Sequence, residues 1–136
     1  MPANQQIHVS AAVITDSEGR ILLVRKRNTP FFMQPGGKLD AGETPEQALI
    51  RELHEELQLD ITLEQLHPLG QFTDMAANEA NHTLIADMFR IEKVSGDIVP
   101  AAEIEEILWL SPEDSAIHAL APLTLNKVIP LLNRMG

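Results

Sequence analysis

Residues Gly36 to Leu59 read GGKLDAGETPEQALIRELHEELQL, and this segment is the most informative part of the sequence. Its first part is a loop punctuated by glycines, and its second part is a helix with a clear start signal. Thr44 is a suitable N-cap, Pro45 suits the first helical position, and Gln47 completes a Thr-x-x-Gln capping box. The sequence therefore predicts a helix that begins at Thr44.

Apolar residues recur at helical spacing along this segment and define the face that packs on the core. They are Leu49, Ile50, Leu53 and Leu57. Glu52, Glu55 and Glu56 fall together on a neighbouring sector, where each pair of like charges costs about 0.2–0.5 kcal/mol in water. Taken alone, the three glutamates are most simply a solvated acidic surface. A hard divalent cation such as Mg²⁺ would instead use them as ligands.

A longer pattern joins the loop to the helix. Gly37 is followed after five residues by Glu43 and, after seven more, by Arg51-Glu52-Leu53-x-Glu55-Glu56, which leads to the aliphatic Leu59. This pattern resembles the signature of the Nudix hydrolases. One position departs from it, because the family usually has glycine where this chain has Gln58. Glutamine adopts the left-handed conformation of a helix C-cap only at some cost.

The resemblance implies an α+β fold, an α/β/α sandwich whose mixed central sheet carries helices on both sides. It also implies hydrolysis of a diphosphate linkage in a nucleoside diphosphate derivative, with Mg²⁺, or Mn²⁺ as a substitute. Glu52, Glu55 and Glu56 match the metal-binding positions of the family, with Glu52 as ligand or base. Arg51 would orient these carboxylates, and Gly37 would add its carbonyl oxygen as a further ligand.

The order of the predicted elements agrees with this fold class. Strands are expected at residues 8–15, 21–25, 83–94 and 107–110, the first two as a hairpin. An extended segment with a kink or bulge is expected over 60–74, and helices are expected to start at Ser111 and Leu123. We expect Pro130 to bend or shorten the last helix. With 136 residues, the chain is expected to form a single domain over 1–136.

Charge and composition exclude several partners. The formal net charge of −10 argues against binding a nucleic-acid polymer, since that requires a basic surface. There is no cysteine, which excludes disulfides and cysteine-based zinc sites. The N-terminus lacks the features of a signal peptide, and no apolar run approaches membrane-spanning length. We therefore expect a cytoplasmic protein, a monomer or homodimer, that takes a small nucleotide as its substrate.

Two groups of residues before the glycine loop are candidates for substrate binding. Arg25, Lys26 and Arg27 form the densest basic cluster of an acidic chain. Arg25 and Arg27 are predicted to reach phosphate groups, and surface charges that serve solubility alone are an equal alternative. Phe31 and Phe32 follow in the connection to the loop. Either they fill the core beneath the loop, or Phe32 forms an aromatic wall for a flat group such as a nucleobase.

The resemblance also suggests contributors outside the signature. Glu103 lies before the strand that contains Trp109, where MutT-type members of the family carry an extra carboxylate, and it is predicted to be catalytic. Glu79 is the alternative, and either residue could instead be a solvated surface acid. Asn126 lies where those members place an asparagine that reads the base, whose amide can pair with a purine edge. A helix-surface asparagine without a role is an equal alternative.

Features that mark several subgroups of the Nudix hydrolases are absent from this sequence. The chain has no tyrosine, the marker of dinucleoside polyphosphate hydrolases in this family, and lacks the proline typical of the ADP-ribose group. It therefore looks closest to MutT-type enzymes, which convert a nucleoside triphosphate, sometimes a modified one, to a monophosphate and pyrophosphate. Nucleotide sugars or other nucleoside diphosphate derivatives remain an alternative. A non-catalytic binding module would have lost the carboxylates, all of which are present.

Overall fold

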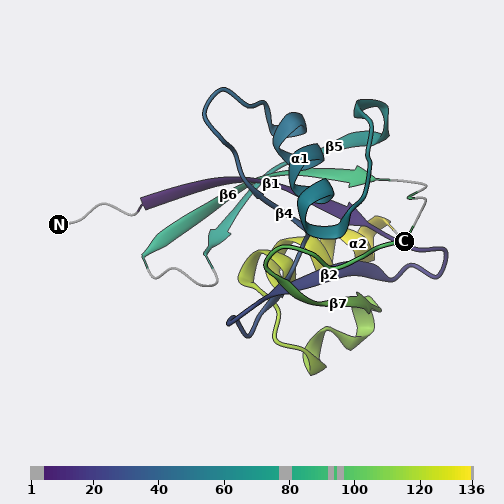
Figure 1. Ribbon diagram of the computed structural model, residues 1–136. Coiled ribbons are helices and arrows are strands. Elements are labelled where there is room, and N and C mark those ends of the chain that lie inside the picture. Colours follow the sequence, from purple (N-terminus) through teal and green to yellow (C-terminus); the bar gives the residue numbers. More distant parts are fainter. Residues whose placement is uncertain (1–4, 77–80, 92–93, 95–96, 136) are drawn as a thin grey trace.

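The computed structural model describes residues 5–76, 81–91, 94 and 97–135 (Figure 1). In chain order, the elements of these residues are β1 (Gln5–Ile14), β2 (Ile21–Lys26), β3 (Phe32–Met33), β4 (Gly36–Lys38), α1 (Pro45–Leu57), β5 (Leu66–Met75), β6 (His82–Ile91), β7 (Ile104–Leu110) and α2 (Ile129–Met135). Leu63–Gln65 and Pro112–Ile117 form 3₁₀ turns, and Thr124–Val128 forms a π-helical turn.

The strands form two sheets. The larger has the order β4–β1–β6–β5, in which β1 is parallel to β6 and the other pairs are antiparallel. The smaller is antiparallel, with the order β3–β2–β7. The prediction that residues 8–15 and 21–25 form a hairpin is wrong, because apart from one bridge between Thr15 and Ile21 the two strands lie in different sheets. Both edges of β1 are occupied by β4 and β6, which leaves none for β2.

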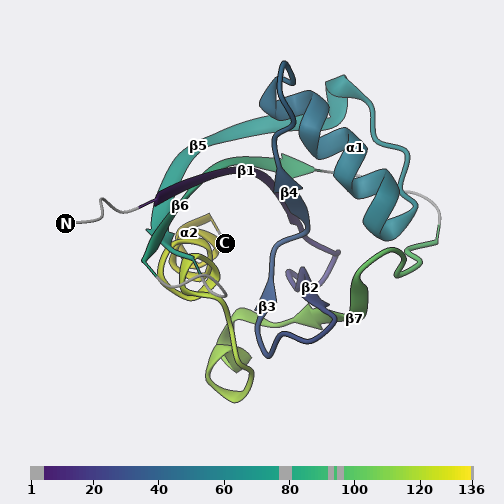
Figure 2. The ribbon, with the colours of Figure 1, turned by 60° about the vertical axis from the view of Figure 1, so that its left-hand side comes forward.

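Helices α1 and α2 lie on opposite faces of the larger sheet (Figure 2). Alternate residues of β1 point to opposite faces of the sheet. Ile14 packs in a cluster with Leu53 of α1, whereas Val13 packs in a cluster with Ile129 of α2. The second half of β1 is buried on both faces, and it has the continuous apolar run Ala11, Ala12, Val13 and Ile14 that such a position requires. The predicted α+β class with helices on both sides is confirmed, although the strands divide between two sheets.

The predicted start of α1 is confirmed. Thr44 is the N-cap, its side chain accepts from the backbone N–H of Gln47, and the Gln47 side chain accepts from the backbone N–H of Thr44. At the other end, Gln58 is the C-cap with φ 55° and ψ 34°, the left-handed conformation expected from its place in the signature. Its N–H is satisfied by the carbonyl oxygen of His54.

The later segments differ in detail from their predictions. The expected bulge is present, since the register between β5 and β6 shifts between Pro68 and Gly70. The segment after Ser111 forms a 3₁₀ turn instead of an α-helix. The last helix is shortened, as expected for Pro130: Thr124–Val128 form a π-helical turn, and α2 begins at Ile129, one residue before this proline, which has no N–H to donate. Within the described residues, the helices are too short and too polar to cross a membrane.

Candidate active site

The three glutamates of α1 face three different environments. Glu56 is 2% exposed, the side chain of Glu52 is 14% exposed, and that of Glu55 is 51% exposed. The gradient follows from helical spacing, because Glu56 lies next to the apolar stripe, Glu52 further round the helix and Glu55 furthest. One helix thus presents carboxylates from its buried edge to solvent.

Arg51 connects these carboxylates to the glycine loop. Its guanidinium donates two hydrogen bonds to Glu43, at 2.8 and 2.9 Å, one to Glu52 Oε1 at 2.6 Å, and one to the carbonyl oxygen of Lys38 at 3.1 Å. Its ion pair with Glu55 is longer, at 3.5 Å. The bidentate partner of Arg51 is therefore Glu43, which braces the loop against the helix.

The same contacts set the acid–base properties of this pair. Hydrogen bonds from Arg51 lower the pKa of Glu43 to about 2. In return, the hydrogen bonds with Glu43 raise the pKa of Arg51 above its usual value. Both groups are therefore fully charged at neutral pH, and their contact links the helix to the loop under all physiological conditions.

Glu56 is a buried carboxyl group with incomplete hydrogen bonding. Its Oε1 accepts a hydrogen bond of 3.3 Å from the backbone N–H of Gly36, whereas its Oε2 has no partner within the described residues. Burial raises the pKa of Glu56 to about 8, although Lys26 acts in the opposite direction. Burial likewise raises the pKa of Glu52, against the effect of Arg51. Both carboxyl groups therefore favour a compensating positive charge.

The glycines of the loop permit two close approaches. Gly36 lies at φ +146°, and a Cβ there would overlap the backbone of Ser10 in the paired strand β1. A Cβ on Gly37 would overlap the carboxylate of Glu52. Gly36 therefore permits the strand pairing, and Gly37 leaves the space that the Glu52 carboxylate occupies.

The donor set fits the divalent metal implied by the sequence. Within the described residues, no three His, Asp or Glu side chains are already arranged around a metal position, and Arg51 pairs with both Glu52 and Glu55. The orphaned Oε2 of Glu56 is the observation that favours a cation, since a buried carboxylate oxygen without a donor is stabilised by a metal. Carboxylates are also the ligands that Mg²⁺ prefers.

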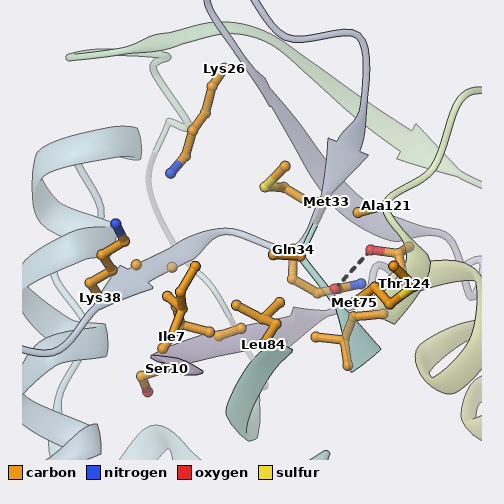
Figure 3. A pocket seen from close by; sticks show the side chains of 16 residues that line it. Ile7, Ser10, Lys26, Met33, Gln34, Lys38, Met75, Leu84, Ala121 and Thr124 are labelled. Atoms are coloured by element: carbon orange, nitrogen blue, oxygen red, sulfur yellow. Dashed lines mark hydrogen bonds between the residues drawn. The ribbon is translucent and has the colours of Figure 1, made fainter. Parts of the chain in front are cut away.

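A cleft begins at the glycine loop beside this cluster, and its lining residues come from both sheets. Figure 3 shows Lys26 and Lys38 at one end, with their ammonium groups directed toward each other, and Gln34 hydrogen-bonded to Thr124 at the other. Apolar side chains line the space between these two ends. They include Ile7, Val9, Met33, Met75, Leu84 and Leu123. A charged group followed by an apolar one would match this cleft.

Lys26 joins the cleft to the glutamates. It lines the cleft, its charge acts on both Glu52 and Glu56, and its Nζ pairs with Glu103 Oε1 at 3.3 Å. Glu103 also lies close enough to raise the pKa of Glu56. The structure thus brings Glu103 to the carboxylate cluster, as its predicted role requires. The alternative, Glu79, lies outside the described residues.

Four residues predicted to bind substrate do not line the cleft. Arg25 pairs with Glu106 at 2.7 Å and Arg27 with Glu105 at 3.5 Å, both toward β7. Phe32 packs in the core cluster of α2 and meets the ring of His118 edge-on, the first of the two alternatives considered above. Their roles in substrate binding remain predictions.

Asn126 is the fourth residue that was predicted to bind substrate and does not line the cleft. Its side-chain amide donates to Asp74 Oδ2 at 2.9 Å on an exposed surface. Asp74 immediately precedes Met75, which lines the cleft, so Asn126 lies beside the cleft rather than in it. A base-reading role of Asn126 also remains a prediction.

Sequence reasoning missed most residues of the cleft, among them the buried polar pair Gln34 and Thr124. Gln34 is 6% exposed and Thr124 is fully buried. One signal was available, because Gln34 is a polar residue between the apolar segment of Phe31 to Met33 and the glycine loop. Nothing in the sequence indicated that Thr124, far along the chain, would meet it.

Comparisons with known proteins agree with this geometry. Residues 5–132 match the model of the NUDIX domain. The CTP pyrophosphohydrolase of Escherichia coli (strain K12) is 30% identical over 133 residues, which are 94% of this chain and 90% of that protein. The 8-oxo-dGTP diphosphatase of Proteus vulgaris is 39% identical over 66 residues, which are 46% of this chain and 59% of that protein.

The aligned part thus spans little more than half of the Proteus vulgaris protein. Among solved structures, the MutT protein from Methanosarcina mazei Go1 superposes with a TM-score of 0.79 at 22% identity, over 99% of this chain and 98% of that one. At that identity the likeness shows the fold alone. The family match covers nearly the whole chain and includes the glycine loop and α1, and the chain therefore belongs to the Nudix family.

Proposed function

We propose that this protein is a Nudix hydrolase that converts a nucleoside triphosphate to the monophosphate and pyrophosphate. The observation that carries the proposal is the buried, half-satisfied carboxyl group of Glu56 at the charged end of a cleft whose other end is apolar. Such a cleft suits a polyphosphate chain joined to a nucleoside. The E. coli CTP pyrophosphohydrolase, alignable over almost the whole chain, supports this substrate class.

In the proposed reaction, water adds to a phosphorus atom of the bond between the α- and β-phosphates, and the bridging P–O bond breaks. The added water supplies the oxygen and the protons that the two products require. When bound, Mg²⁺ would neutralise the diphosphate charge and lower the pKa of the attacking water. Glu52, Glu55 and Glu56 would hold the metal, with the carbonyl oxygen of Gly37 as a further ligand.

The other residues act by position and charge. Arg51, fixed by Glu43, would keep Glu52 and Glu55 in place. Lys26 lines the cleft next to Glu56 and would attract the phosphate chain. Glu103 is a candidate for the general base, as is Glu52, because proton removal from the water needs a carboxylate near the metal ligands.

The test is a hydrolysis screen of the purified protein over nucleoside triphosphates, nucleotide sugars and dinucleotides. We expect pyrophosphate release from at least one nucleoside triphosphate in Mg²⁺, and less with the metal chelated. Activity confined to nucleotide sugars would favour the alternative substrate class. The absence of turnover with either Mg²⁺ or Mn²⁺ would contradict the assignment as an enzyme.

A further inference from the structure

Gln34 is a buried polar side chain at the apolar end of the cleft, and the proposed reaction does not use it. It directly follows β3, is 6% exposed and lines the cleft together with Thr124. Hydrolysis of a phosphate linkage requires no amide at the end remote from Lys26 and Lys38 (Figure 3). Its burial there needs a different explanation.

The side-chain amide of Gln34 is satisfied on one side only. Its Oε1 accepts a hydrogen bond of 2.9 Å from the hydroxyl of Thr124, which is itself fully buried. Its Nε2 has no hydrogen-bond partner within the described residues. A buried donor without a partner costs free energy in the ligand-free protein. The Thr124 hydroxyl thus orients the amide and leaves its donor side for a ligand.

The surroundings of Gln34 restrict what that ligand can be. The neighbouring walls come from Met33, Met75, Leu84 and Leu123, which are aliphatic or thioether side chains. Figure 3 shows the Gln34 side chain reaching toward Thr124 and Met75. A group that fits has apolar faces and a hydrogen-bond acceptor at its edge. A nucleobase has both properties.

We propose that Gln34 determines substrate specificity by donating a hydrogen bond from Nε2 to a carbonyl oxygen or ring nitrogen of the nucleobase. The inference rests on the proposed function, because the base is that of the nucleoside triphosphate at the charged end. Thr124 is a positioning residue that acts through Gln34. Buried donors discriminate strongly between substrates, since a base without the matching acceptor leaves the donor unsatisfied.

The experiment compares wild-type protein and Gln34→Met on the preferred nucleoside triphosphate and on analogues that each lack one ring acceptor. Methionine keeps the unbranched shape and removes the donor. We expect kcat/KM for the preferred substrate to fall roughly 10-fold in Gln34→Met. For the analogue that lacks the contacted acceptor, wild type and variant should be equal. An equal loss on every substrate, or no loss at all, would overturn the proposal.

Three further variants separate specificity from structure. Gln71→Met makes the same change at an exposed glutamine of β5 that does not line the cleft, and we expect the preference among bases to stay as in wild type. Thr124→Val should lose the preference and Thr124→Ser should keep it, because only serine retains the hydroxyl. Selectivity that survives Thr124→Val would contradict the positioning role.

The double variant Gln34→Met/Thr124→Val removes both hydrogen-bonding partners at once. Replacing both partners with apolar groups is nearly neutral or stabilising, so its thermal midpoint should equal or exceed that of wild type while its selectivity is lost. A large fall in the midpoint would identify Gln34 as a structural residue and overturn the inference. If the wild type hydrolyses nucleoside triphosphates and only the Gln34 results fail, the proposed function stands and this inference alone is wrong.

Discussion

The two ends of the cleft are built in opposite ways. At the α1 end, charged side chains from one helix and the loop before it meet around Arg51, with carboxylates that range from buried to exposed. At the Gln34 end, apolar side chains from β1, β3, β5, β6 and the C-terminal segment surround a single pair of polar groups. The group around Arg51 comes from one stretch of the chain, to which Lys26 and Glu103 are added from elsewhere, whereas the Gln34 end is assembled throughout from distant segments.

The difference suggests a division of labour. All nucleoside diphosphate derivatives share the phosphate linkage, and the α1 end has the charges that this common part requires. The attached group varies between substrates, and the Gln34 end meets that part. Substitutions at the α1 end should therefore lower turnover of every substrate by the same factor, whereas substitutions at the Gln34 end should change the ratio between substrates.

The largest effect is expected for Glu55→Gln, which removes one carboxylate of the proposed metal site. Turnover should fall roughly 100- to 1,000-fold on all substrates alike. Because Glu55 is half exposed, the fold should be unaffected. Glu46→Gln, the same change in the first turn of α1, is the matched control and should retain activity. A changed ratio between substrates in Glu55→Gln would contradict the division of labour.

Alanine at the two loop glycines tests the α1 end more finely. Gly37→Ala should displace the Glu52 carboxylate and reduce activity on all substrates with little loss of stability, because a side chain can move. Gly36→Ala meets the backbone of Ser10 at a positive φ, and should cost about 2 kcal/mol or more of unfolding free energy. Denaturant unfolding and kinetics measure both. Equal loss of stability in the two variants would refute this distinction.

The α1 end of the cleft is the part of the site that could be predicted from the sequence. Thr44, Pro45 and Gln47 specify where α1 begins through contacts within one turn, and helical spacing alone brings Glu52 and Glu56 together. The fold class followed from the order of the elements. Neither inference required knowledge of which strands pair.

The Gln34 end of the cleft, and the ion pairs that join distant strands, could not be predicted in this way. The charge of Arg25 predicts a contact with phosphates and says nothing of Glu106, which lies opposite it on β7 and pairs with it. Pairing between β2 and β7 is a long-range property that residue type does not reveal. The contact between Gln34 and Thr124 depends on how the C-terminal segment packs. Charge and helical spacing indicate which residues lie at the α1 end, whereas the residues at the Gln34 end are determined by how distant segments pack.

The pH dependence of stability should also distinguish the two ends. The pKa of Glu56 is about 8 in the folded protein against its usual 4.5, so folding takes up a proton between these values. The unfolding free energy of the metal-free protein should therefore fall as the pH rises from about 5 to about 8. Denaturant unfolding at several pH values measures it. Mg²⁺, which requires the deprotonated form, should stabilise the protein more at the upper end of this range.

Glu56→Gln is the control for that measurement. A neutral amide at this position retains an oxygen to accept from Gly36, and the fall in stability with rising pH should become smaller. The Gln34→Met variant should leave the pH dependence unchanged, since no titrating group is removed. An identical slope in wild type and Glu56→Gln would mean that another group is responsible.

The smallest expected effect is at the end of α1. The C-cap residue Gln58 has a left-handed backbone conformation, which glycine adopts at a lower free-energy cost than glutamine. Gln58→Gly should therefore raise the unfolding free energy by about 0.5–1 kcal/mol. Thermal and denaturant unfolding measure this change. Neither turnover nor substrate preference should change, because Gln58 lies outside the cleft. A loss of stability would show that the Gln58 side chain makes contacts that outweigh the backbone cost.

The parallel pairing of β1 with β6 has a consequence for how the protein is made. Residues 5–14 cannot complete their sheet until residues 82–91 are available, although the glycine loop and α1 between them can form early through local contacts. A nascent chain of which α1 has just emerged from the ribosome would therefore contain the whole signature without a working cleft. Activity should emerge late in refolding, together with the closure of the long loop between the first and the sixth strand.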